Sequence, residues 1–297
     1  MIETEELNSH SALQNSHYNR FIDPNTGLQL TYSGDYRGGR WNNGVLVSNS
    51  GKSYPVVSGI PNFVGHYDDA LGRQCVEEDW IQRNHEYRKK KPSNQRTHLL
   101  DAFLKQMTDS QGIILEIAAG PSGGNAPSVL MHNLDASILL NDISYLMLEQ
   151  WKDLLQREGY RNISFAAFDI RSMPLESGSF DIVSDYFGIN NIVSDVPKAV
   201  SEVDRILRKG GCLYSVAINL CKKDVEKLPT WLRDEINEQY LCDYEQLFTK
   251  TGLKMIDKEY LCTRRLYPDE SGIASVAQDH YVILRAELYT YVFVKQE

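Results

Sequence analysis

The sequence predicts an α/β fold, in which a mostly parallel β-sheet carries helices on both faces, plus a small N-terminal β-rich unit. Two observations predict this fold. From residue 111 onward, short apolar runs alternate with amphipathic segments, as in βαβ units around a buried parallel sheet. Residues 21–66 consist of short strand-like pieces between turn signals such as DPNTG, SGD and NNG. The length of 297 residues and the 42% hydrophobic content suit about one to two domains.

Three parts follow one another along the chain. Residues 1–66 are expected to form a tail and the β-rich unit, and residues 67–110 a helical connector. In the connector, apolar residues of the segment Cys75–Tyr87 recur at helical intervals until RKKKPSNQ ends the pattern. Residues 111–297 are expected to form the main α/β domain.

The main domain contains five apolar runs that we expect as strands: GIILEIA, SILLND, ISFAAFD, SFDIVSDY and GCLYSVAI. Amphipathic segments predict helices at Pro127–Asn133, Leu146–Glu158 and Val196–Arg208. Near the end, Asp243–Thr251 predicts another helix, LKMIDKEYL a sixth strand and HYVILRAELYTYVFVK a long last strand or a hairpin.

The charge pattern disfavours a dedicated nucleic-acid binder. The chain has 31 Lys and Arg against 40 Asp and Glu, a net charge of -9, and the surplus acids all lie after residue 100.

The longest uncharged stretch, from Ile117 to Leu134, is interrupted by glycines and prolines, so no membrane span is expected. The first residues lack the basic start and apolar run of a secretory signal, so we expect a cytoplasmic protein.

Polar and small residues follow two of the predicted strands. The first strand ends in LEIAAGPSGG, residues 116–124 of which place small residues where a backbone can approach a ligand closely. The second ends in Asn141-Asp142, about 20 residues later, where a nucleotide-binding sheet places an acid for ribose hydroxyls. Taken alone, the first motif fits a plain strand-to-helix turn equally well, and each acid could be a strand-end cap.

The motifs FDIRSMPLESGSFDIV and RILRKGG follow in order, and with them the chain resembles the class I S-adenosylmethionine-dependent methyltransferases, especially the small-molecule-type group. The resemblance covers roughly residues 111–219, and residues 244–295 fit the family's last helix and antiparallel end strand. It implies a Rossmann-like fold. It also implies that Glu116 lies near the methionine amino group of the cofactor, that the turn through Ala118 and Gly120 passes under it, and that Asp142 binds the ribose with Ile143 beside the adenine.

The resemblance assigns three further cofactor contacts. Asp169 would accept a hydrogen bond from the adenine amino group, and Ile170 would supply a backbone donor and an apolar contact. Tyr186 and Phe187 would end the strand that faces the transferable methyl group. Tyr186 is the first candidate for a general base, although an aromatic wall is the favoured interpretation, and His280 is the second.

Two segments depart from the family pattern. The glycine-x-glycine-x-glycine turn is Ala118-Ala119-Gly120-Pro121-Ser122 here, and alanine is still small enough for a close approach. Where relatives often have Leu-His-His, this chain has Ile189-Asn190-Asn191, so a histidine base is absent from that place. We interpret Asn190 and Asn191 as caps of the following helix, together with Ser194 and Asp195.

The β-rich unit is similar to a small zinc ribbon that precedes some methyltransferases, most clearly in YPVVSGIPNFV. The positions that match its four metal-binding cysteines are Asp23, Thr26, Val47 and Ser50. These cannot form a thiolate tetrahedron, so no metal is expected. An apolar core of its own would come from Tyr54, Val56, Ile60 and Phe63, helped by packing on the main domain.

Together these features predict methyl transfer from S-adenosylmethionine to a small-molecule acceptor by in-line displacement, which leaves S-adenosylhomocysteine. Trp80, Tyr87 and the insert Cys221–Cys242 are expected to select the substrate. Three alternatives stay open. The chain could methylate RNA, because similar zinc-bearing modules occur in ribosomal RNA methyltransferases and Arg88 to Lys91 are basic. It could be a catalytically silent cofactor-binding partner. It could also be a nicotinamide-dependent dehydrogenase, although that class does not account for the FDI and RKGG motifs.

Overall fold

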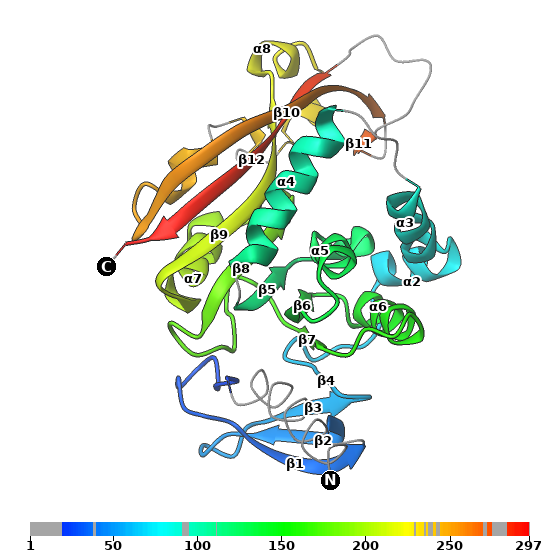
Figure 1. Ribbon diagram of the computed structural model, residues 1–297, viewed down its shortest axis with the longest axis vertical. Helices are drawn as coiled ribbons and strands as arrows, with labels where there is room; N and C mark the ends of the chain where they lie inside the picture. The colour runs from blue at the N-terminus through cyan, green and yellow to red at the C-terminus, as the bar shows by residue number, and fades with distance from the viewer. Residues whose placement is uncertain are drawn as a thin grey trace.

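A computed structural model describes residues 20–37, 40–90, 95–110, 112–228, 230–234, 236, 240–241, 244–269, 272–274 and 284–296. Within these residues two β-sheets form, a four-stranded one near the N-terminal end and an eight-stranded one in the rest of the chain (Figure 1). No helix of the described part is long and apolar enough to cross a membrane. His280, Lys91 and Cys242 lie outside the described residues.

The larger sheet has the strand order β11-β10-β12-β9-β8-β5-β6-β7. The bounds are β5 Ile113–Ile117, β6 Ser137–Asp142, β7 Ile163–Ala167, β8 Phe180–Tyr186, β9 Leu207–Leu220, β10 Leu253–Asp269, β11 Gly272–Ala274 and β12 Leu284–Lys295. Strands β9, β8, β5, β6 and β7 pair in parallel, whereas β12 is antiparallel to both of its neighbours, β9 and β10. This is the predicted Rossmann-like sheet with an antiparallel last strand, and the prediction is confirmed.

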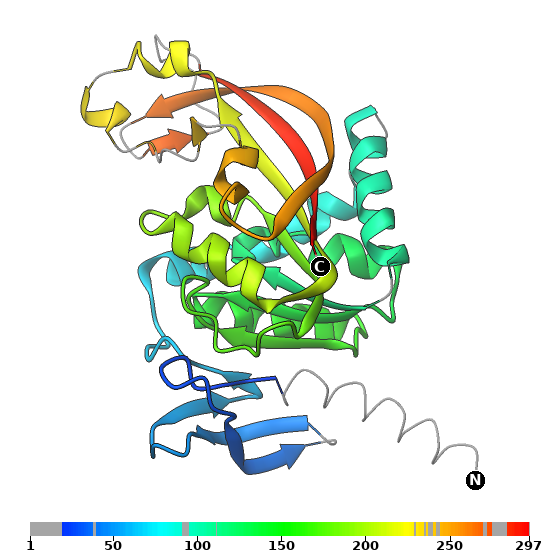
Figure 2. The same cartoon turned by 90° about the vertical axis from the view of Figure 1, so that its left-hand side faces the viewer.

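Helices cover both faces of this sheet. They are α2 Ala70–Glu77, α3 Trp80–Lys89, α4 Gln95–Asp109, α5 Ala126–His132, α6 Tyr145–Arg157, α7 Val196–Ile206, α8 Lys222–Val225 and α9 Thr230–Arg233, with 3-10 turns η1 Gly120–Ser122, η2 Ile189–Asn191 and η4 Tyr244–Phe248. Alternate residues of β5 point to opposite faces: Leu115 packs in the core with α7 and η4, and Ile114 in the core with α4, α5 and α6. Figures 1 and 2 show the helices on both sides of the sheet.

The smaller sheet is antiparallel, with strands β1 Thr31–Arg37, β2 Arg40–Val47, β3 Ser53–Val57 and β4 Ile60–Pro61. It lies beside β7, the edge strand of the larger sheet (Figure 1). The Phe63 N–H donates to the carbonyl of Ala167 at 2.8 Å, and the Ile22 N–H donates to Pro174 at 3.0 Å. An open sheet edge is a template for unwanted pairing, so the small sheet protects this edge.

Four predicted elements differ from the structure. The segment Cys75–Tyr87 is not one helix, because Asp79 adopts φ +56 and separates α2 from α3. The helix expected over Asp243–Thr251 is only the 3-10 turn η4, and Asp243 lies outside the described residues. Both β9 and β10 are longer than the apolar runs that predict them. The start of β9 pairs with β8 at Leu207 and its end pairs with β12, whereas β10 pairs with β12 from Leu253 to Leu266.

Candidate cofactor site

The predicted site residues gather at the carboxyl edge of the parallel strands. Chain order reverses at β5, because β6 and β7 continue to one side of it whereas β8 and β9 lie on the other. Glu116 on β5 pairs in register with Ser184 on β8 at this point. In open α/β sheets, the crevice at such a switch point is where ligands bind.

The turn after β5 winds tightly around this crevice. Ala118 and Gly120 both have positive φ, +46 and +57, which is costly for alanine and free for glycine. A Cβ on Gly120 would meet nothing within 4 Å, so the backbone faces open space there. At Gly124 (φ +59) a Cβ would lie 1.8 Å from Oε1 of Glu116, so the turn can pass the carboxylate only as glycine.

Glu116 is a buried carboxylate whose oxygens receive no hydrogen bond of normal geometry within the described residues, and its side chain is 0% exposed. Burial raises the pKa of Glu116 to about 8, and the charge of Asp185 acts in the same direction. The Ser184 hydroxyl, the Asn125 N–H and the charge of Arg88 oppose this rise. An orphaned acceptor of this kind fits a cationic ligand group, such as the ammonium group of a bound amino acid moiety.

Asp142 closes the turn onto the end of β6. Its carboxylate accepts hydrogen bonds from the Gly120 N–H at 2.7 Å and the Ser144 N–H at 2.8 Å. Burial raises its pKa in spite of these bonds. A carboxylate has about four acceptor positions, so the N–H groups of Gly120, Ser144 and Ile143 do not use all of them. Asn141, which the motif analysis did not single out, accepts from the Ala118 N–H at 3.2 Å and donates to the Phe168 carbonyl at 2.9 Å.

Asp169 lies after β7 and is held by a neighbour in the chain. Arg171 donates to both carboxylate oxygens, and this pairing lowers the pKa of Asp169. One third of the Asp169 side chain is exposed (33%), so it stays accessible to a further donor. Ile170 is buried, whereas Ile143 is 48% exposed. Of these two predicted apolar contacts, Ile143 is therefore the accessible one.

Tyr186 ends β8 and packs against Phe187, with 4.3 Å between the ring centroids. Phe187 has φ +63, so the chain turns sharply here. Asp185, one residue earlier, is fully buried and accepts from the hydroxyls of Tyr244 at 2.6 Å and Ser215 at 2.7 Å. These hydrogen bonds connect β8 to β9 and η4, so the backbone next to Tyr186 and Phe187 is held in place.

Arg88 of α3 takes part in the same site, which the sequence did not predict. It donates to the carbonyls of Ser122 at 2.8 Å and Gly124 at 2.6 Å and to the Ser128 hydroxyl at 2.8 Å, and its guanidinium lies 5.7 Å from the Tyr186 ring centre. Burial lowers its pKa. The use of Arg88 to Lys91 as one basic run that could serve RNA binding is therefore wrong for Arg88. Arg88, Lys89 and Lys90 are consecutive basic residues, and nothing in the sequence distinguishes Arg88 from the two lysines.

The asparagines of η2 do not cap α7. The Asn190 side chain is 0% exposed and pairs with the backbone of Ile218, accepting from its N–H at 3.0 Å and donating to its carbonyl at 3.2 Å. Asn191 accepts from the Tyr240 hydroxyl. The N-cap residue of α7 is Asp195, which makes no side-chain cap bond. The predicted capping role is wrong because β9 extends far enough to reach η2.

The two candidates for substrate selection on α3 differ in exposure. Trp80 packs partly against the core and donates to Glu78 at 2.7 Å, whereas Tyr87 is 64% exposed.

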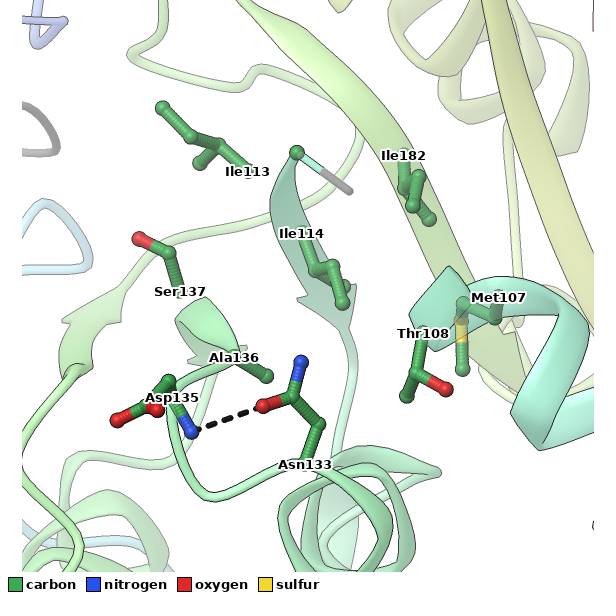
Figure 3. A pocket seen from close by; sticks show the side chains of 10 residues that line it. Met107, Thr108, Ile113, Ile114, Asn133, Asp135, Ala136, Ser137 and Ile182 are labelled. Carbon is green, nitrogen blue, oxygen red and sulfur yellow. Dashed lines mark hydrogen bonds between the residues drawn. The ribbon is translucent and has the colours of Figure 1, made fainter. Parts of the chain in front are cut away.

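A separate cavity of about 390 Å³ lies at the opposite, amino edge of the sheet, lined among others by Met107, Ile113 and Ser137 (Figure 3). Because parallel strands carry their ligands at the carboxyl edge, this cavity is not part of the candidate site.

Asp23 occupies the place of a metal-binding cysteine in the zinc-ribbon-like unit and is buried in a hydrogen-bond network. Its carboxylate accepts from the Tyr54 hydroxyl at 2.9 Å, the Asn25 N–H at 3.0 Å and the Ser50 hydroxyl at 3.5 Å. Burial by itself would raise the pKa of Asp23, but the hydrogen bonds from Asn25, Tyr54 and Ser48 lower it to about 2. Among the residues that the structure describes, no group of three or more His, Cys, Asp or Glu could hold a metal ion.

The comparisons with known proteins agree with this geometry. The family model described as "Methyltransferase domain" matches residues 115–215. The chain is 36% identical over 97 residues to a mitochondrial 2-methoxy-6-polyprenyl-1,4-benzoquinol methylase of Leishmania donovani, covering 33% of this chain and 32% of that protein. It is 34% identical over 101 residues to the ubiquinone/menaquinone biosynthesis C-methyltransferase UbiE of Hahella chejuensis, covering 34% and 40%.

Longer matches are more distant. A demethylmenaquinone methyltransferase of Chlamydia pneumoniae is 26% identical over 189 residues, covering 55% of this chain and 80% of that one. A solved structure of a putative methyltransferase from Bacillus halodurans matches with a TM-score of 0.50 at 15% identity, covering 66% of this chain and 99% of that chain, which shows a shared fold. Residues 115–215 therefore match a methyltransferase domain, and the chain shares the fold of a solved structure of a putative methyltransferase. The chain spans only about a third to two fifths of the length of the first two relatives above.

Proposed function

We propose that this protein is an active S-adenosylmethionine-dependent methyltransferase that acts on a small-molecule acceptor. The observation that supports it most is Glu116, a fully buried carboxylate at the switch point of the sheet whose oxygens receive no hydrogen bond of normal geometry within the described residues. A buried unsatisfied carboxylate costs stability, and a ligand cation would remove that cost. S-adenosylmethionine carries an ammonium group of the required charge and, when bound, supplies an activated methyl group.

Different residues would bind and orient different parts of S-adenosylmethionine. Glu116 would hold the amino group, and the turn from Ala118 to Gly120 would pass beneath it. Asp142 would hold the ribose hydroxyls with Ile143 beside the adenine, and Asp169 with Ile170 would hold the adenine edge. Arg88 stabilises the turn by binding two of its carbonyls, so it would keep the crevice in shape. Positioning of this kind accounts for much of the rate in a displacement reaction.

Tyr186 and Phe187 would border the space where the acceptor meets the methyl group. We propose that Tyr186 acts there as an aromatic wall, because its ring packs between Phe187 and the Arg88 guanidinium. An aromatic wall favours a flat, partly apolar acceptor. Several relatives are named for quinol or quinone substrates, which makes hydroxylated aromatic rings the first acceptors to test.

The test has two stages. Calorimetric titration of the full chain with S-adenosylmethionine should show binding that Asp142→Ala and Asp169→Ala weaken, while NADH should not bind. Release of S-adenosylhomocysteine should then be followed with a panel of quinols and other small phenols. Absence of S-adenosylmethionine binding would refute the proposal, binding without turnover across the panel would favour the silent partner, and turnover only with RNA would favour an RNA methyltransferase.

The structure weakens the main sequence argument for RNA. Of the basic run, Arg88 is occupied at the glycine turn and Lys89 forms an ion pair with Glu158. A phosphate-binding surface needs several clustered basic side chains, and two of the three described residues of this run already have partners within the chain. We therefore place small-molecule methylation first.

A further inference from the structure

A cavity between the small sheet and the main domain carries a concentration of positive charge. It has a volume of about 400 Å³ and is lined by Arg37 and Arg40 of the small sheet and by Lys152 of α6. Its apolar wall includes Trp41 and Phe165. This cavity is remote from Glu116 and the glycine turn, since it borders β7 at the edge of the sheet.

Neighbouring contacts hold two of the three cations at the cavity. Lys152 donates to the Ser58 carbonyl in the turn between β3 and β4, and Arg40 donates to the Arg161 carbonyl before β7. Both side chains are partly buried, whereas Arg37 is exposed at the rim. These contacts fix the cations from both sides of the junction between the two sheets.

The cations that line the cavity repel one another, and two acids of α6 offset part of this repulsion at Lys152. Burial lowers the pKa of Lys152, and the charges of Arg40 and Arg37 add to this effect, while Asp153 and Glu149 on the same helix oppose it. The chain as a whole has a net charge of -9, so a group of three cations around one cavity is a local exception. A bound anion would relieve the repulsion, and guanidinium groups suit phosphate oxygens because they can donate two parallel hydrogen bonds.

We infer that this cavity binds the phosphate group of a small organic phosphate, whose carbon skeleton lies against Trp41 and Phe165. The volume of about 400 Å³ is within the usual range for small-molecule sites. A nucleic-acid backbone is less suitable, because it needs an extended basic track and not an enclosed group of three cations. Since the ligand would contact both sheets, its binding would also stabilise their junction.

The experiment is a calorimetric titration of the full chain with inorganic pyrophosphate, which contains no nucleoside and so does not report on the methyltransferase site. We expect binding, weakened at least about tenfold by Arg37→Ala and by Lys152→Met, the latter keeping the apolar stem. Arg83→Ala, an exposed arginine of α3, is the matched control and should bind as the unchanged protein does.

Thermal unfolding of each variant separates lost binding from lost folding, and Arg37 is exposed enough for its variant to fold. Pyrophosphate should raise the melting temperature of the unchanged protein and of Arg83→Ala but not of Arg37→Ala. Absence of pyrophosphate binding, or equal binding in all variants, would overturn the inference. Tighter binding of a single-stranded RNA that depends on the same residues would overturn it as well, in favour of nucleic acid.

Discussion

The two regions of the molecule each bury a carboxylate, and they treat it in opposite ways. In the small sheet, Asp23 receives hydrogen bonds from a hydroxyl and from backbone and side-chain amides, and its pKa falls to about 2. At the carboxyl edge of the main sheet, Glu116 receives none of normal geometry, and its pKa rises to about 8. The comparison teaches that one region is complete by itself, whereas the other is built around a group that a ligand would satisfy.

The two carboxylates should therefore respond to pH in opposite directions. Asp23 has a folded pKa of about 2 against 3.8 for the ordinary group, so its contribution is present above about pH 4 and is lost as the pH falls towards 2. Glu116 has a folded pKa of about 8 against 4.5, so the folded state keeps a proton that the unfolded state releases. Its effect makes the protein less stable as the pH rises from about 4.5 to 8.

The largest effect is expected for Glu116→Gln. This change should weaken S-adenosylmethionine binding at least about 100-fold, or about 3 kcal/mol, because a buried ammonium group would lose its counter-charge. In the unchanged protein, affinity should rise with pH up to about 8, since binding must first expel the proton of Glu116. Calorimetry over pH 6–9, in buffers of different ionisation enthalpy, measures both affinity and proton release.

The control for this change is Glu86→Gln, which removes an exposed carboxylate of α3. It should leave both affinity and proton release unchanged. If Glu116→Gln binds the cofactor as tightly as the unchanged protein does, the contrast between the two regions has no functional meaning.

The next largest effect is expected for Asp23→Ala, in the small N-terminal unit. Asp23→Ala should lower the free energy of unfolding by roughly 2–3 kcal/mol, because the Tyr54 hydroxyl and the Asn25 amide lose their buried acceptor. Chemical denaturation measures it, and Asp35→Ala, an exposed acid of β1, should stay within about 0.5 kcal/mol. Stoichiometric zinc in the purified protein would contradict the description of this unit as a metal-free one.

A smaller effect is expected where α3 meets the glycine turn. Arg88→Lys removes the forked donors that hold the Ser122 and Gly124 carbonyls, so S-adenosylmethionine affinity should fall roughly tenfold. Lys90→Ala, an exposed neighbour, should have no effect in the same titration. Equal affinity of both variants would show that the turn keeps its shape without Arg88.

The smallest effect tests backbone strain in the turn. Ala118 has φ +46, so Ala118→Gly should raise the free energy of unfolding by about 0.5–1 kcal/mol, the relief of strain exceeding the extra freedom of the unfolded chain. The matched control, Ala119→Gly at φ -59, should lower it by a similar amount. Two changes of the same sign in denaturant unfolding would speak against a strained turn.

Much of the fold and of the candidate site followed from the sequence. The apolar runs predicted the five parallel strands, because a strand buried on both faces needs continuous apolar residues. The positions of Glu116, Asp142 and Asp169 followed from their places after such runs, since parallel strands end at one edge. Local pattern determines these features, as each depends on residues adjacent in the chain.

Only the tertiary structure decided the features that join distant segments. Arg88 reads as one of four basic residues, and its role depends on where α3 packs against the turn after β5. The cations around the junction cavity come from β1, β2 and α6, and the Tyr54 hydroxyl that donates to Asp23 comes from β3, 31 residues away. Whether a buried charge is satisfied depends on packing between elements, which sequence spacing does not specify. The sequence by itself thus determined the kind of domain and the strand ends where the candidate site lies, and packing decided which buried charges receive hydrogen bonds from other elements.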